Sequence, residues 1–208
     1  MILSMSCERQ LLLGVAGALS LFAGGAMAQP APDPVAAALF REGRDLIKEG
    51  RWDEGCPKIE ASLERFPAAS PQLNLALCEE HGGRVATAWA MAQRAQTLNR
   101  ERVGKKRRAS RDAAARELIA RLEPRLPYLT VRVVPAVDGA RVQEEDGELP
   151  LDTPVPLDPG EHQLRLEAPG YATSERVVVL REGEAMTVEL GFPYAPPSPA
   201  PGSTTEPP

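Results

Sequence analysis

The stretch VPLDPGEHQLRLEAPGY, residues 155–171, decides the fold of the C-terminal part of this 208-residue chain. Asp158-Pro159-Gly160 is a strong turn signal, and Ala168-Pro169-Gly170 is a second one. Between the turns, Leu164 and Leu166 alternate with polar residues, which is the pattern of a strand with one buried face. The stretch therefore predicts a strand held between two tight turns.

The same alternation continues on both sides of this stretch. Upstream, residues 129–133 and 140–144 read as strands, and downstream a Val-rich strand at 176–180 is followed by a last strand at 186–190. Short strands separated by Gly and Pro turns predict a small β-sandwich over residues 128–192.

The run Val155-x-Leu157-Asp158-Pro159-Gly160-Glu161-His162, followed by Ala168-Pro169-Gly170-Tyr171 and the Val-rich strand, resembles the PEGA module. The resemblance spans about residues 128–191 and implies an extracytoplasmic, non-catalytic domain without a settled ligand. One departure is the acidic hairpin around Glu144-Glu145-Asp146, which lacks the spacing of a calcium loop. His162 faces inward by alternation and is expected to be a packed structural histidine.

The other half of the chain, residues 35–125, is rich in Ala, Leu, Arg and Glu with helical periodicity. Residues 29–34 are a short Pro-rich lead-in, and residues 193–208 form a Pro-rich tail expected to be disordered. The expected helices cover about residues 35–49, 53–65 and 71–81, a fourth from about Arg84, and a fifth stretch from about 101 to 122. The fold class is thus an α+β multidomain chain, with helical hairpins followed by a small all-β sandwich.

A shift of 33 residues superimposes small residues of this helical zone. Gly43 meets Ala76, Gly50 meets Gly83 and Gly55 meets Ala88, so that paired helices could approach closely. The pattern resembles the tetratricopeptide repeat (TPR), with about two copies over residues 36–101 and the fifth helix as a cap. A generic α-helical hairpin bundle is the alternative.

The TPR resemblance implies a groove that binds peptides or partner proteins along the first helix of each repeat. Its positions in this sequence are Phe40, Arg44, Ile47, Lys48, Leu73, Asn74, Leu77 and Glu80. Asn74 matches a carboxylate-clamp position of one subfamily, but the rest of that clamp is missing, so a clamp is not predicted.

Charge divides between the two halves. Residues 33–127 carry 18 basic against 14 acidic side chains, and residues 128–192 carry 5 against 13. The opposite signs suggest either two halves that dock or two independently solvated surfaces. A basic run predicts an anionic contact, to the acidic half or to an anionic envelope polymer, with a solvated helix face as the alternative; it comprises Arg100, Arg102, Lys105, Lys106, Arg107, Arg108 and Arg111.

Residues 1–28 read as a secretory signal peptide. The apolar run from Leu11 to Ala23 is too short to span a bilayer, and Ala26-Met27-Ala28 fits a cleavage site before Gln29. An uncleaved anchor is the alternative. We therefore expect an exported chain, periplasmic or secreted, with no integral membrane span after cleavage.

Cys56 and Cys78 are expected to form a disulfide. Cys7 leaves with the signal peptide, so two cysteines remain in an oxidising compartment. Both lie 11 residues from Pro67, at which two antiparallel helices should turn, and therefore at a similar height above that turn. Two buried free thiols are the alternative.

No catalytic or cofactor-binding motif is found. The sequence lacks GxSxG, GxGxxG, GxxxxGK[ST], HExxH and CxxC, and neither His81 nor His162 has zinc-ligand neighbours. The net charge of −5 and the absence of aromatics within the basic run argue against nucleic acid as partner. We therefore expect no catalysis, cofactor or metal, and a scaffold or adaptor for envelope proteins; the alternative is a peptidoglycan- or polysaccharide-binding module acting through the β-domain.

Overall fold

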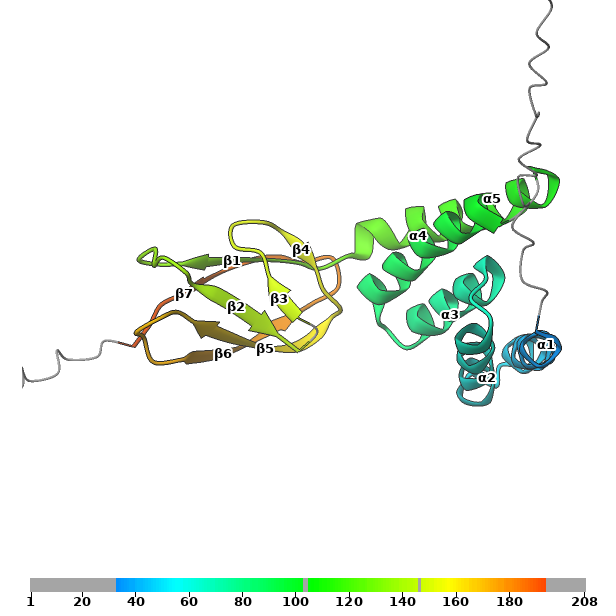
Figure 1. The fold of residues 1–208 in the computed structure, drawn as a ribbon, viewed down its shortest axis with the longest axis horizontal. Helices are drawn as coiled ribbons and strands as arrows, with labels where there is room; N and C mark the ends of the chain where they lie inside the picture. The colour runs from blue at the N-terminus through cyan, green and yellow to red at the C-terminus, as the bar shows by residue number, and fades with distance from the viewer. Residues whose placement is uncertain (1–32, 103–104, 146, 194–208) are drawn as a thin grey trace, which may run out of the picture. The chain divides into compact units, whose positions relative to one another are not determined.

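The computed structural model describes residues 33–102, 105–145 and 147–193 (Figure 1). In this part of the chain, five helices and a 3₁₀ turn precede seven strands, which confirms the α+β arrangement. The helical elements are α1 (Pro34–Lys48), α2 (Trp52–Arg65), α3 (Ala69–His81), α4 (Val85–Arg102), α5 (Lys105–Leu122) and η1 (Glu123–Arg125). The strands are β1 (Tyr128–Val133), β2 (Arg141–Glu144), β3 (Gly147–Leu149), β4 (Val155–Pro156), β5 (Gly160–Glu167), β6 (Ser174–Leu180) and β7 (Ala185–Leu190). None of the described helices is both long and apolar enough to cross a bilayer.

Helices α1 and α2 pack against each other at two glycines. A Cβ atom on Gly43 would lie 2.8 Å from the carbonyl oxygen of Gly55, and a Cβ atom on Gly55 would lie 2.7 Å from that of Gly43. Nearby, the buried hydroxyl of Ser62 donates to the carbonyl of Ala36 over 2.8 Å. The small residues that the offset repeat picked out are therefore what allows this close helix approach.

The expected disulfide joins α2 to α3. The Cα atoms of Cys56 and Cys78 are 5.9 Å apart, within the range of an unstrained bridge. Cys78, Ile59 and Leu75 form a small buried cluster beneath the bridge. The covalent link thus reinforces a helix contact with few buried side chains.

The later helices share a separate core. Ala76 of α3, Ala88 and Ala92 of α4, and Leu118 and Leu122 of α5 are buried against one another. Alanines of α3 and α4 make up half of the buried cluster, so these two helices approach closely, and the leucines of α5 pack against them.

The strands form two sheets around one apolar core. The first has the order β4-β1-β7, with β7 parallel to β1 in the register Leu129↔Met186; the second has the order β3-β2-β5-β6, all antiparallel. Ten buried Leu and Val side chains from both sheets, in the described residues, make up the core. The strand quoted at the outset is β5, and it lies in the middle of the four-stranded sheet with Leu164 and Leu166 fully buried.

The helices and strands belong to one compact unit, and Asp158 links them. Its carboxylate accepts the backbone N–H groups of Ala86 and Thr87 over 2.7 and 3.0 Å, and the Thr87 hydroxyl over 2.6 Å. The carboxylate therefore caps the first turn of α4, where free N–H groups favour an anionic acceptor. The Asp-Pro-Gly turn of the strand half completes a helix of the other half.

Candidate docking groove

A pocket of about 220 Å³ lies where α1, the α2–α3 link and α5 meet. Its largest apolar lining residues are Phe40 of α1 and Phe66 of the link, with Pro71 at the start of α3. Arg111 of α5 closes the rim. The remaining lining residues are Asp33, Ala36, Ala37, Ser62, Ala68 and Ser70.

Local sequence explains why the two phenylalanines meet at this pocket. Phe66 follows α2 in extended conformation, and Pro67 follows it, so the chain leaves the helix at this point. Phe40 lies one turn after Ala36, on the same α1 face. Asp33 caps this helix: its side chain accepts from the backbone N–H groups of Val35 and Ala36.

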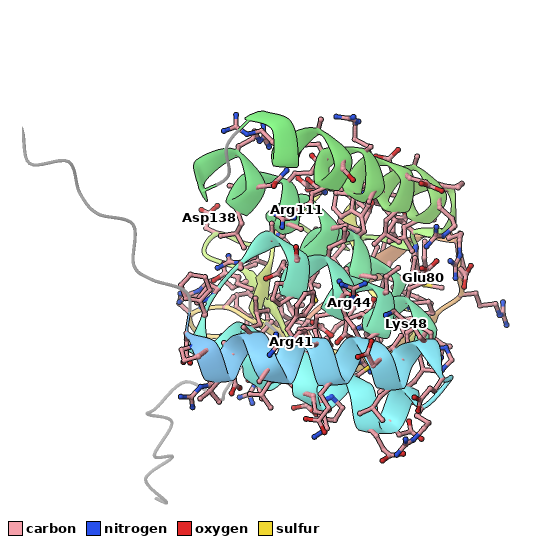
Figure 2. The ribbon with its side chains drawn as sticks, turned by 90° about the vertical axis from the view of Figure 1, so that its right-hand side faces the viewer. Arg41, Arg44, Lys48, Glu80, Arg111 and Asp138 are labelled. Carbon is pink, nitrogen blue, oxygen red and sulfur yellow. A yellow bond between two sulfur atoms is a disulfide. The ribbon has the colours of Figure 1, made fainter. Side chains whose placement is uncertain are left out.

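Three arginines lie on this side of the molecule, one of them in the pocket lining. In the described part of the chain, Arg41, Arg44 and Arg111 form no ion pair, and the Arg44 guanidinium lies 5.5 Å from the centre of the Phe40 ring. Figure 2 shows Arg41 and Arg44 along α1 and Arg111 on the same face of the molecule. The rim therefore offers positive charge to a ligand seated on the apolar floor.

The one carboxylate at the pocket, Asp33, is already engaged. Partial desolvation raises its pKa, but the two N–H donors of α1 and Arg65, 3.1 Å away, outweigh this and hold the pKa below its usual range. Asp33 is therefore ionised and satisfied at neutral pH, and the three unpaired arginines exceed it in charge.

The residues predicted for the groove occupy several environments. Phe40 lines the pocket and Arg44 lies beside the Phe40 ring, whereas Ile47 packs against Gly55 between α1 and α2. Lys48 pairs with Asp45 at 2.8 Å. On α3, Leu73 and Leu77 pack against the alanine-rich core, the Asn74 amide donates to the carbonyl of Ser70, and Glu80 binds two arginines.

Glu80 belongs to a salt-bridge network at the junction of the two halves. Arg121 lies 2.6 Å from one of its oxygens and Arg125 2.8 Å from the other, and Arg125 also lies 2.5 Å from Glu182 of the β6–β7 turn. The hydrogen bond from Arg121, opposed by desolvation and aided by Arg125, lowers the pKa of Glu80. Arg121 and Arg125 are therefore engaged in ion pairs within the fold, unlike Arg111 at the pocket.

The predicted basic patch is only partly described. The side chains of Arg102, Lys105, Lys106 and Arg107 lie outside the described part of the structure, and Arg100 is exposed. The carbonyl of Arg108 accepts the buried Asn99 amide over 2.9 Å. Arg111, predicted as part of this patch, instead lines the pocket together with Phe40.

Phe66, Pro71 and Ala37 were not predicted as groove residues. The position of Phe66 directly before Pro67 was the one available signal that it leaves the second helix. The proximity of Arg111 to Phe40 could not be predicted from the sequence, because the two residues are 71 positions apart and no local pattern relates them.

In the strand half, His162 is packed as expected. Its two ring nitrogens lie 2.8 Å from Glu144 Oε1 and 2.8 Å from the carbonyl oxygen of Asp158. Both neighbours are acceptors, so a protonated ring satisfies both. Desolvation lowers the pKa of His162, but the bonds to Glu144 and Asp158 outweigh it and raise the pKa. In the described residues, no group of His, Cys, Asp and Glu is arranged to hold a metal ion.

One family model matches the strand half. Residues 129–195 match the family model of the PEGA domain, which covers β1 to β7. The match points to a binding module, and together with the disulfide it fits an extracellular or periplasmic protein. No curated protein matches the chain.

Proposed function

We propose that this protein is a non-catalytic adaptor of the cell envelope, whose helical half docks an extended acidic segment of a partner protein. The observation that carries the proposal is the pocket between α1 and α5, in which Phe40 and Phe66 form an apolar floor and Arg111 stands at the rim. An acidic side chain or terminal carboxylate next to an apolar side chain complements both features.

Two further features support the adaptor. The helices are arranged as successive hairpins with small residues at their crossings, as in TPR-like proteins that bind peptides along the first helices of their repeats. The apolar N-terminal run with its cleavage site before Gln29, the disulfide and the PEGA match are consistent with export. An anionic envelope polymer is a second ligand class with the same charge requirement.

The proposal is tested by selecting displayed random octapeptides on the purified protein. We expect selected peptides that combine Asp or Glu with Leu, Ile or Phe, and affinity at least about tenfold weaker for the double variant Arg44→Glu, Arg111→Glu. Arg94→Glu, an exposed charge reversal on α4 away from the pocket lining, is the matched control and should bind as the unaltered protein does.

Selected peptides without acidic residues, or equal binding by the double variant and the control, would contradict the groove. In cells, a photo-crosslinking residue at Phe40 should capture a protein that the same residue at Arg94 does not. If Phe40 captures only sugar polymer, the adaptor is wrong.

The alternative, a polysaccharide-binding β-domain, is favoured by one observation. Tyr171 is 51% exposed, its ring contacts that of Phe192 in a tilted arrangement with centroids 4.5 Å apart, and it lines a pocket of about 300 Å³ with Arg141 and Glu167. An exposed aromatic face beside charged groups suits a sugar ring. This function predicts that the unaltered protein binds purified peptidoglycan. Binding should be lost in Tyr171→Ala and kept in the double variant Arg44→Glu, Arg111→Glu.

A further inference from the structure

Strand β6 is the last strand of its sheet and leaves one edge open. It pairs only with β5, from Gly160↔Leu180 to Leu166↔Ser174, and Figure 1 shows it at the outer side of that sheet. In the described residues, no backbone hydrogen bond joins the other edge of Ser174–Leu180 to a further element. An open edge of this length is a template for another strand.

The outward side chains of β6 make that edge apolar at its centre. Val177 and Val179 are 53% and 54% exposed, while Val178 and Leu180 point into the core. Natural edge strands are commonly protected by charges, Pro or bulges. In β6 the charged side chains, Glu175 and Arg176, lie near its start, and the three consecutive valines at its centre carry no such protection. These two exposed β-branched side chains lie beside the open edge and give a second strand an apolar surface to pack against.

The order of outward residues specifies which chain fits. The outer face of β6 presents Glu175, Val177 and Val179, and the alternation continued by one residue past the strand puts Arg181 next in this row. If a second copy lies antiparallel with Val178 opposite Val178, Glu175 faces Arg181 of the second copy and Val177 faces its Val179. Every outward residue then meets a complementary one, on both sides of the two-fold axis.

The neighbouring registers that keep the same face outward lack this match. With Val177 at the axis, Glu175 faces a valine; with Val179 at the axis, Arg181 faces a valine. In the register with Val178 opposite Val178, Arg176 faces Leu180 of the second copy. The two Arg176 residues are then about 13 Å apart along the strands, so the repulsion between their charges is weak. Glu175 lies opposite Arg165 of β5 and accepts a 3.4 Å contact from Gln163, but in the described residues neither Glu175 nor Arg181 forms an ion pair.

We propose that two copies of this chain associate through β6, as an antiparallel strand pair centred on Val178, with reciprocal Glu175–Arg181 ion pairs. The pairing joins two four-stranded sheets into one continuous sheet. It does not depend on the pocket of the helical half, so each proposal can fail without the other.

The test is sedimentation equilibrium of the purified protein across the micromolar range, with charge-reversed variants. The unaltered protein should show a reversible monomer–dimer equilibrium. Glu175→Arg and Arg181→Glu should each weaken the dimer at least about tenfold, because each variant places like charges opposite each other twice. The double variant should restore the dimer, since it exchanges both charges.

An equimolar mixture of the two single variants should associate as a heterodimer. One copy then carries arginine at positions 175 and 181 and the other carries glutamate at both, so each facing pair has opposite charges. Glu189→Arg, a reversal at an exposed position of β7, is the control and should leave the dimer unchanged. Thermal unfolding of each variant checks that the fold is retained.

Three results would overturn the proposal. The first is a protein that stays monomeric throughout the concentration range, and the second is a dimer that both single variants retain. The third is association with an unrelated strand-forming peptide at β6 while the protein shows no self-association, which would assign the edge to a different partner.

Discussion

The strand half is built around ten buried Leu and Val side chains in one core, whereas the contact between α2 and α3 rests on three, Ile59, Leu75 and Cys78, in the described residues. Pairs such as β1 with β7 are distant in sequence, but the helices mostly contact their immediate neighbours in the chain. The stability of the helical half therefore depends on a few specific links. These are the disulfide, the contact between Gly43 and Gly55, and the cap that Asp158 of the strand half provides for α4. Each link can be broken separately.

The largest expected effect comes from the disulfide. Replacing Cys56 and Cys78 by Ser should lower the free energy of unfolding by about 3 kcal/mol, because the bridge closes a 22-residue loop in the unfolded chain. Hydrogen exchange should speed up in α1 and α2 and remain slow in β5. Equal acceleration in β5 would mean that the two halves unfold together, and the contrast between them would be lost.

A second, smaller effect is expected at the glycine contact. In Gly55→Ala the new Cβ would lie 2.7 Å from the carbonyl oxygen of Gly43, so α1 and α2 must separate at a cost of about 2 kcal/mol. Gly82→Ala is the control, because its Cβ would meet nothing closer than 3.4 Å. Chemical denaturation measures both variants, and equal stability of the two would show that the helices yield without cost.

These links were predictable from sequence to different degrees. Equal distances of Cys56 and Cys78 from Pro67 located the disulfide, and the offset repeat singled out Gly43 and Gly55. Both inferences are local, because a helical hairpin brings together residues that are symmetric about its turn.

Other features could not be read from the sequence. On the fifth helix Ala115 is buried and Ala114 is exposed, a choice that the sequence does not reveal because consecutive alanines hide a shift of one residue. Strand β3, which follows the acidic hairpin, was not expected, and the parallel pairing of β1 with β7 is set by contacts far apart in the chain. At the candidate site, Phe40 and Arg44 were predicted, but their meeting with Arg111 requires the packing of α5.

A third prediction tests the cap that links the two halves. Asp158→Ala should destabilise the protein by about 1 kcal/mol, because it removes the acceptor of two N–H groups at the start of α4. Asp158→Asn keeps an acceptor and should cost only a few tenths of that. Thermal unfolding checks the order, and an Asn variant as unstable as the Ala variant would show that the negative charge, rather than hydrogen bonding, matters.

The smallest effect is a pH dependence at His162. Its pKa in the folded protein is raised above the ordinary value of about 6.5, so the protonated ring stabilises the fold. This contribution is complete below about pH 6.5 and is lost as the pH rises through the higher folded pKa. Unfolding measured from pH 6 to 8 should therefore show a decline that His162→Gln reduces; an identical decline in the variant would assign it to another group.

The cap at Asp158 also bears on the order in which the protein matures. Arg84 precedes α4 and is paired with Glu79, so the helix receives its capping carboxylate from a residue more than 70 positions later in the chain. A polypeptide emerges N-terminus first, from a ribosome or through a translocation channel. The first turn of α4 therefore lacks its capping carboxylate until the Asp-Pro-Gly turn has also emerged. Truncated chains that stop short of this turn therefore carry a frayed helix end that proteases can recognise, and full-length chains do not.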